Sequence, residues 1–219
     1  MSLFIFIDKY DNRRMASKKK MKNITFFTSF ITLFSFLYKA GLGIYSMSLV
    51  LIIASISTLM VFICKMAFVK AVTKTRDKKK RSYLFMSIAS FIYALVFLLF
   101  VVLKVNNIDI SSQKEYTGWL GILLISFMAI MFILSVINLK GSLEKTDIMV
   151  IGLKEITFIS ALADLVIIEN YVYGIYINYQ EPLNALQIVN QYFSLGVALI
   201  MLVVTVFMFI RYARYKIDN

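Results

Sequence analysis

Apolar residues gather in long stretches along this chain, and clusters of charged residues separate them. A transmembrane helix needs about 20 predominantly apolar residues, whereas a buried strand needs far fewer. Helices also satisfy every backbone hydrogen bond internally, as a bilayer requires. The pattern therefore predicts an all-α, polytopic integral membrane bundle of six transmembrane helices. The predicted spans cover residues 24–38 with an extension to 40, 44–63 with an extension to 69, 83–103, 118–139, 148–168 with an extension to 177, and 188–210.

Glycines and charges suggest where the parts of the chain meet. Gly41-Leu42-Gly43 predicts a tight turn between the first two spans. We expect a basic N-terminal segment over residues 1–23, a transmembrane domain over 24–212 and a short tail over 213–219. The apolar start at residues 2–7 is too short for a signal-peptide core and follows no basic segment. It is interpreted either as an interfacial anchor, as a segment that packs on a partner, or as a loosely held tail.

The positions of Lys and Arg predict the orientation. If there are six spans, all but three of the 24 basic residues fall on one side of the membrane, the exceptions being Lys39, Lys104 and Lys114. Basic residues favour the cytoplasmic side, so both termini are predicted to be cytoplasmic. Trp119 and the tyrosines of residues 171–179 then lie at the outer interface, where amphipathic rings are enriched.

The composition agrees with a membrane location and narrows the compartment. The chain is 60% hydrophobic, and its mean hydropathy is +0.80. Its hydrophobic share exceeds that of a soluble domain, which is about half. Abundant Lys, Ile, Phe and Asn with a single Pro suggest an AT-rich bacterial genome. We therefore expect a multi-pass protein of the bacterial plasma membrane.

The absence of histidine excludes much chemistry. No Ser-His-Asp triad, Cys-His pair or His-bound metal is possible, and the sequence has neither a P-loop nor a dinucleotide fingerprint. Cys64 is the only cysteine, so there is no internal disulfide, and we interpret it as a small packed hydrophobic residue. We expect no cofactor and no bound metal. A membrane enzyme would have to work without histidine and is the weakest of the alternatives.

The fifth span carries ionisable residues, which are functional candidates by default inside a bilayer. If the span is 148–168, Lys154 and Glu155 lie in its inner third and Asp164 near its outer edge. If it is 156–177, the Lys154–Glu155 pair is cytoplasmic and Asp164 is close to the midplane. Apolar and acidic residues over 144–155 recur at helical spacing, which favours the second placement, with a surface helix leading into the membrane.

Asp164 is thus the most informative residue of the sequence. A carboxylate that faced lipid would cost at least about 2.5 kcal/mol, so we expect Asp164 to face the bundle interior. We predict a polar partner on another helix, such as Tyr93 or Asn190. The two interpretations are a structural carboxylate and a contact for a substrate or ion.

Polar residues also begin the sixth span. Gln187, Asn190 and Gln191 share one helical face and would lie level with Glu169. They predict an outward-facing polar pocket, with ordinary hydrogen bonding between helices as the alternative. The candidate pocket residues are Asp164, Glu169, Asn190, Gln191 and Tyr93.

The densest basic cluster lies between the second and third spans. Basic residues next to an anionic leaflet contribute roughly 1 kcal/mol each, so this cluster predicts contact with lipid headgroups or with an acidic partner. The alternative is a topological anchor on a solvated loop, and nucleic acid is not an expected partner. The candidate residues are Arg76, Lys78, Lys79, Lys80 and Arg81.

Three classes of function remain open. The first is a small transport-related component of a membrane complex, and in length, number of helices and orientation the chain resembles the substrate-binding subunits of vitamin importers. The second is an accessory, assembly or immunity protein that acts by helix packing. The third is the histidine-independent enzyme. Because the loops are short, the expected partners are the bilayer, other membrane proteins, or a cytoplasmic protein that docks on the basic side.

Overall fold

The protein is all-helical in the computed structural model, which describes residues 2–105, 119–140, 147–179 and 184–217. The described chain folds into six helices, which confirms the all-α part of the predicted fold class. They are α1 (Ser2–Tyr45), α2 (Leu49–Ala71), α3 (Arg76–Val105), α4 (Trp119–Lys140), α5 (Ile148–Tyr179) and α6 (Asn184–Ile217).

Four of these helices are long and apolar enough to cross a membrane. The segments are Lys19–Tyr45 of α1, Leu49–Ala71 of α2, Arg76–Val105 of α3 and Ile188–Tyr215 of α6. The chain is therefore described as a membrane protein. The number of spans beyond these four and the side on which the termini lie stay predictions.

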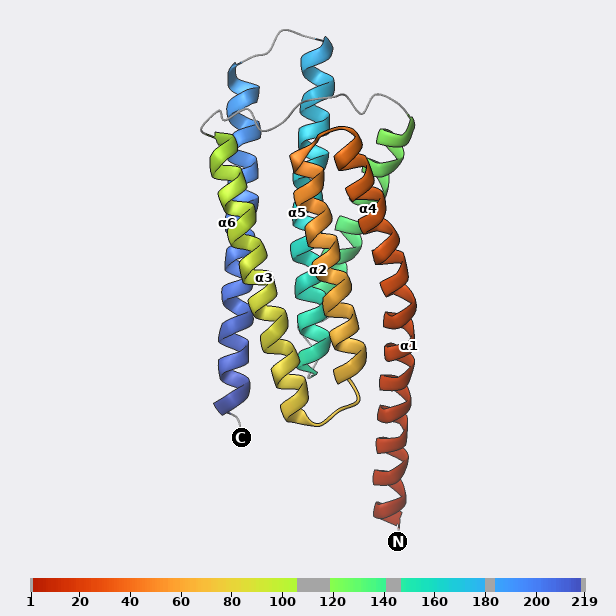
Figure 1. Ribbon diagram of the computed structural model, residues 1–219. Helices are drawn as coiled ribbons and strands as arrows, with labels where there is room; N and C mark the ends of the chain where they lie inside the picture. The colour runs from red at the N-terminus through yellow and green to blue at the C-terminus, as the bar shows by residue number, and fades with distance from the viewer. Residues whose placement is uncertain (1, 106–118, 141–146, 180–183, 218–219) are drawn as a thin grey trace.

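Four of the other helices surround α5. This helix packs against α2, α3, α4 and α6, whereas α1 packs only on α2, and α4 packs only on α5, among the described residues. Both termini lie at one end of the bundle, together with the connection between α2 and α3, and α1 extends beyond the other helices at that end (Figure 1). Because α5 is central, its side chains contact four other helices.

The turn between α1 and α2 lies later than predicted. The Gly41–Gly43 segment continues α1, and the chain turns at residues 46–48, where Met47 has φ 52° and the Ser48 side chain accepts a hydrogen bond from the next helix. Gly43 serves close packing instead, because a Cβ there would lie 2.9 Å from Cγ1 of Ile52. The glycine thus lets α1 and α2 approach closely before the chain reverses.

The interior is built from large apolar side chains and small polar ones. Phe68, Met86 and Met149 are fully buried, and so is Cys64, which confirms its interpretation as a packed hydrophobic residue. Small buried residues such as Ser90 hydrogen-bond to the carbonyl one turn earlier in their own helix. Because lipid is as apolar as these side chains, close packing rather than water exclusion holds such helices together.

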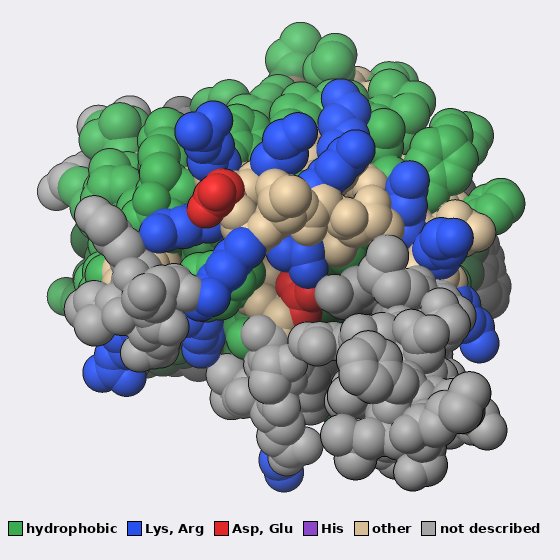
Figure 2. Space-filling view, turned by 90° about the horizontal axis from the view of Figure 1, so that it is seen from below, with side chains coloured by type: hydrophobic (Ala, Val, Ile, Leu, Met, Phe, Trp, Pro, Cys, Tyr) green, Lys and Arg blue, Asp and Glu red, His purple; other side chains and the backbone are tan. Residues whose placement is uncertain are grey.

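Lys and Arg side chains gather at the end of the bundle that holds both termini. Figure 2 shows this end, where basic side chains surround a small number of acidic ones. The distribution matches the charge asymmetry of the sequence.

Candidate functional site: buried charges along α5

Four carboxylates follow one another along α5, and basic residues from three other helices meet them. Asp147 stands directly before the helix, and Glu155, Asp164 and Glu169 lie within it. An isolated charge in an apolar interior is very costly, so buried charges need partners. The partners are Lys79 and Lys104 of α3, Arg211 of α6 and Lys39 of α1.

The first pair lies where α5 begins. The Lys79 ammonium is 2.6 Å from Oδ2 of Asp147, and Oδ1 of Asp147 accepts a hydrogen bond from the backbone N–H of Met149. A carboxylate at this position satisfies a free N–H of the first turn and meets the positive end of the helix dipole. Asp147 therefore both starts α5 and joins it to α3.

The second group joins three helices. Arg211 donates to Oε1 of Glu155, and the Tyr83 hydroxyl donates to Oε2 at 3.1 Å. Glu155 is only 3% exposed, so the expectation that it lies on a cytoplasmic surface helix is wrong. Gly152 makes this arrangement possible, because a Cβ there would lie 2.7 Å from the Tyr83 ring. The described structure shows α5 already buried in its first turns.

The third pair is the deepest. The Lys39 ammonium lies 2.5 Å from Oδ1 of Asp164 and 3.1 Å from the hydroxyl of Thr58, which is near the middle of α2. The prediction that Asp164 faces the interior is confirmed, since it is 7% exposed. Of the two predicted neighbours, Tyr93 interacts electrostatically with Asp164, although its hydroxyl donates to the carbonyl of Ile53 at 3.5 Å. Asn190 is wrong as a partner of Asp164, since it accepts a hydrogen bond from Lys104.

Asn190 belongs to a fourth group, towards the opposite end of the bundle from the termini. The Lys104 ammonium donates to Oδ1 of Asn190, to Oδ1 of Asn170 at 2.7 Å and to the Ser194 hydroxyl at 3.3 Å. Glu169 attracts Lys104 electrostatically. Its Oε2 atom is buried without a hydrogen-bond partner among the described residues. We call these five residues the outer cluster.

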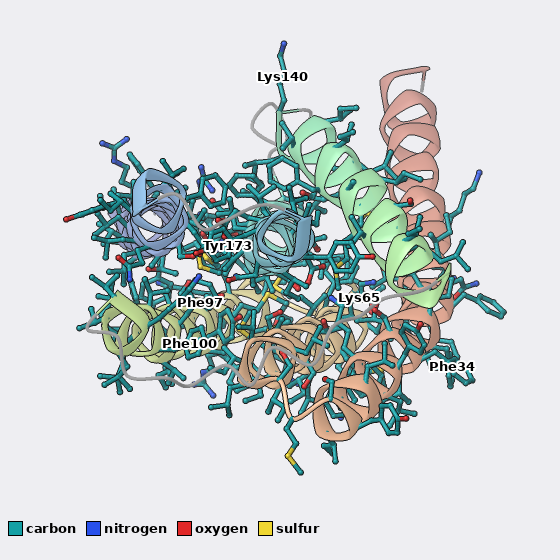
Figure 3. All side chains as sticks on the ribbon, turned by 90° about the horizontal axis from the view of Figure 1, so that it is seen from above. Phe34, Lys65, Phe97, Phe100, Lys140 and Tyr173 are labelled. Atoms are coloured by element: carbon teal, nitrogen blue, oxygen red, sulfur yellow. The ribbon has the colours of Figure 1, made fainter. Side chains whose placement is uncertain are left out.

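Three aromatic rings lie beside the outer cluster. Phe97 and Phe100 precede Lys104 on α3 by two turns and one turn respectively, and both are almost fully buried. Tyr173 lies one turn after Glu169 on α5 and interacts with it electrostatically. Seen from above, these three rings lie between α3, α5 and α6 (Figure 3).

The structure separates the predicted pocket residues into two places. Glu169 and Asn190 meet in the outer cluster, whereas Asp164 and Tyr93 lie deeper, beside Lys39 and α2. Gln191 is half-buried but is not among the hydrogen-bond acceptors of Lys104. The side chain of Gln187 lies outside the described residues. The outer polar region thus exists without Asp164.

The residues of the basic cluster between α2 and α3 differ in their surroundings. Lys79 is 8% exposed and paired with Asp147. Arg76 lies 4.7 Å from the Tyr215 ring centroid, a cation–π contact with α6. Lys80 makes a longer contact of the same kind, with Tyr212. Lys78 and Arg81 are exposed and remain candidates for lipid or partner contact.

The sequence reasoning missed the basic partners, above all Lys39 and Lys104. Both were assigned to the outer side, where they were exceptions to the positive-inside pattern. That exception was the available signal, because a lone lysine beside an apolar span needs a reason to be there. Arg211 and Tyr83 gave no such signal, since each stands where the rules place ordinary interfacial residues.

Three of the four carboxylates along α5 are held in ion pairs. The ion pairs balance the buried charges, and the described residues contain no group of three or more histidine, cysteine, aspartate or glutamate side chains able to hold a metal ion. The outer cluster differs, since it keeps an unsatisfied acceptor. Comparison with protein-family models, with curated proteins and with solved structures gives no match for this chain.

Proposed function

We propose that the protein is a small, transport-related component of a bacterial plasma-membrane complex. In this proposal six helices span the bilayer, both termini are cytoplasmic, and the outer cluster forms an outward-facing polar pocket. The positive-inside pattern supports the orientation. Asp164 shares the Lys39 ammonium with Thr58 of α2, which supports a position near the membrane midplane.

The observation that carries the proposal is the unsatisfied Oε2 atom of Glu169. A buried polar atom without a partner costs about 1–3 kcal/mol, so the fold gains nothing from keeping it there. Lys104 is already held by acceptors from α5 and α6. The group missing from the cluster is therefore a hydrogen-bond donor. We propose a small polar solute that presents a hydroxyl, amide or amine group to Glu169.

Non-enzymatic action is part of the same proposal. The sequence lacks histidine, and the buried carboxylates lie at successive levels of α5, each beside a cation. Such pairs stabilise a fixed arrangement of helices. We accordingly assign binding, and no covalent step, to the outer cluster.

The proposal is tested by purifying the protein in mild detergent and identifying retained molecules by native mass spectrometry. The wild type should retain a polar solute, a membrane partner, or both. Glu169→Gln keeps the volume of the side chain but removes its charge, so it should lose the solute while the melting temperature stays near that of the wild type. A wild-type protein that retains neither solute nor partner contradicts the proposal.

A second candidate is an accessory or assembly protein that acts by helix packing. The observation in its favour is the exposure of α1, since only 17% of its membrane-length segment is buried. A partner helix could cover this face in the bilayer. Retention of a membrane partner without any solute, unchanged in Glu169→Gln, favours this candidate over the first.

A further inference from the structure

The Lys104 ammonium, in the outer cluster, is held by three neutral oxygens. Two are the side-chain amide oxygens of Asn170 on α5, at 2.7 Å, and of Asn190 on α6. The third is the hydroxyl of Ser194 on α6, at 3.3 Å. An ammonium has three N–H donors, so these three oxygens, which we call the oxygen cage, use all of them. The three oxygens converge on one point, because each lies within hydrogen-bond distance of the same nitrogen atom.

Two oxygens of the cage are oriented by their own helices rather than by Lys104. The Asn170 amide nitrogen donates to the carbonyl of Val166 at 2.6 Å, which leaves the amide oxygen as the acceptor for Lys104. The Ser194 hydroxyl donates to the carbonyl of Asn190 at 3.2 Å, so only its lone pairs face the ammonium. Asn190 and Ser194 are 3% and 0% exposed. The cage is therefore expected to keep its shape when the ammonium leaves.

Glu169 offers the same ammonium a second position. Lys104 forms no ion pair with any described residue, although Glu169 attracts it electrostatically. The Oε2 atom of Glu169 is buried and has no hydrogen-bond donor among the described residues. A shift of the Lys104 side chain to Glu169 would satisfy this oxygen and leave the cage empty. One cation thus serves two positions, and in either arrangement one of them lacks its partner.

A second cation would satisfy both positions at once. The oxygens of the cage are neutral, which suits a single positive charge, whereas calcium and magnesium ions in proteins take carboxylate ligands. Neutral carbonyl oxygens bind monovalent metal ions in other membrane proteins. The ion needs no cavity beyond the space that the Lys104 ammonium vacates. Such a site uses neither histidine nor cysteine, so the composition of the chain does not argue against it.

We propose that the oxygen cage binds a monovalent metal cation, and that Lys104 then moves to Glu169. When the ion is absent, Lys104 occupies the cage as a tethered competitor. The ion adds one positive charge to the cluster, so wild-type binding is weak and reversible. The inference concerns the outer cluster but does not rest on the proposed solute, because Lys104 itself supplies the donor that Glu169 lacks.

The test measures binding of sodium and of potassium to the detergent-purified protein by isothermal titration calorimetry. Choline chloride keeps the ionic strength constant, and no solute is added, so the result is independent of the proposed function. Lys104→Met removes the competitor and leaves Glu169 to balance the ion. It should bind the tighter of the two ions at least about tenfold more strongly than the wild type, since apparent affinity falls with the fraction of molecules whose site is open. Equal or weaker binding by Lys104→Met would overturn the proposal.

The matched control removes one oxygen of the cage. Asn190→Leu, added to Lys104→Met, keeps the volume of the side chain but deletes its oxygen. Ion affinity should fall by roughly tenfold or more, because the loss of a residue that only supports a ligand already costs about 10- to 100-fold. Lys70→Met, at an exposed position near the opposite end of the bundle, should leave the affinity within about twofold of the wild type. Unchanged binding after the loss of Asn190 would place the ion elsewhere and overturn the proposal.

Glu169→Gln tests the movement of Lys104 and leaves all three oxygens of the cage in place. It removes the second position of the ammonium, so ion binding should fall at least about tenfold from that of the wild type. If Lys104→Met does not fold, thermal unfolding of the wild type and of Glu169→Gln carries the test. Replacing choline by sodium or potassium should raise the melting temperature of the wild type but not that of Glu169→Gln, because only a bound ion stabilises the folded state. Equal responses of the two proteins, or no response of the wild type, would overturn the proposal.

Discussion

Lys39 on α1 and Asp164 on α5 lie 2.5 Å apart in the interior, although the two helices do not pack on each other. The long lysine side chain bridges the distance, and Thr58 of α2 accepts a second hydrogen bond from it. The ion pair therefore connects α1 to the central helix α5 across α2, the helix on which α1 packs.

Breaking this pair from one side should destabilise the protein strongly. Asp164→Leu leaves Lys39 buried and unpaired, so we expect a loss of about 3–5 kcal/mol of stability. Lys39→Met combined with Asp164→Leu removes both charges and should recover most of that loss. Thermal unfolding in detergent measures the effect. A double variant as unstable as the single one would show that the side chains act separately.

Gly152 should not tolerate even a methyl group. Gly152→Ala places a Cβ against the buried Tyr83 ring, and such overpacking costs about 1–3 kcal/mol. Gly196→Ala is the control, because a Cβ at Gly196 meets nothing within 4 Å. Alanine favours helix by up to about 1 kcal/mol over glycine, so the control should melt at the wild-type temperature or above it. Equal melting temperatures for both variants would contradict the close contact.

The two neighbours Lys78 and Lys79 should respond differently to neutralisation. Lys79→Gln leaves Asp147 without its cation and should cost about 1–3 kcal/mol, whereas Lys78→Gln should change stability by less than about 0.5 kcal/mol. Asp147→Ala should lower stability as well, since it also removes the cap of α5. Differential scanning fluorimetry compares the three. A larger effect for Lys78 would show that the exposed part of the basic cluster is structural.

Single cysteines introduced outside the predicted spans test the proposed topology. In a background without Cys64, cysteines at Ser17 and Ser142 should react only after the membrane is permeabilised, and those at Ser112 and Asn184 should react with an impermeant maleimide from outside. Ser17 and Ser112 test the first three spans, and Ser142 and Asn184 test the next two. Outside labelling of Ser17 would reverse the orientation, and outside labelling of Ser142 would remove the fourth span.

The helices could be predicted from the sequence because long apolar stretches admit no other regular structure in a bilayer. The interior of the bundle could not be predicted in the same way. The hydropathy of the fifth span shows that Asp164 needs a polar partner. It does not show which helix supplies that partner, because the partner depends on how the six helices pack. Lys39 is 125 residues away in the chain, and only the three-dimensional arrangement brings the two together.

The outer cluster was predicted in part for the same reason. The spacing of polar residues at the start of the sixth span predicted a polar helical face that includes Asn190. The predicted ends of the fifth and sixth spans placed Glu169 at the same depth in the membrane. Lys104, which organises the cluster, comes from α3 and looked like an ordinary residue at a helix end. The turn after Tyr45 was misplaced because a glycine that permits close packing of helices has the same sequence signature as one that permits a turn.

The distribution of partners around α5 also bears on how the chain is made. Helices α1 and α3 are synthesised before α5. The cations that lie beside Asp164, Asp147 and Glu169 are therefore already present when α5 is made, and they are Lys39, Lys79 and Lys104 respectively. Glu155 must wait for Arg211, near the end of translation. A nascent chain that stops before α6 therefore holds Glu155 without its cation and with only the Tyr83 hydroxyl as a hydrogen-bond donor, until the last helix supplies Arg211.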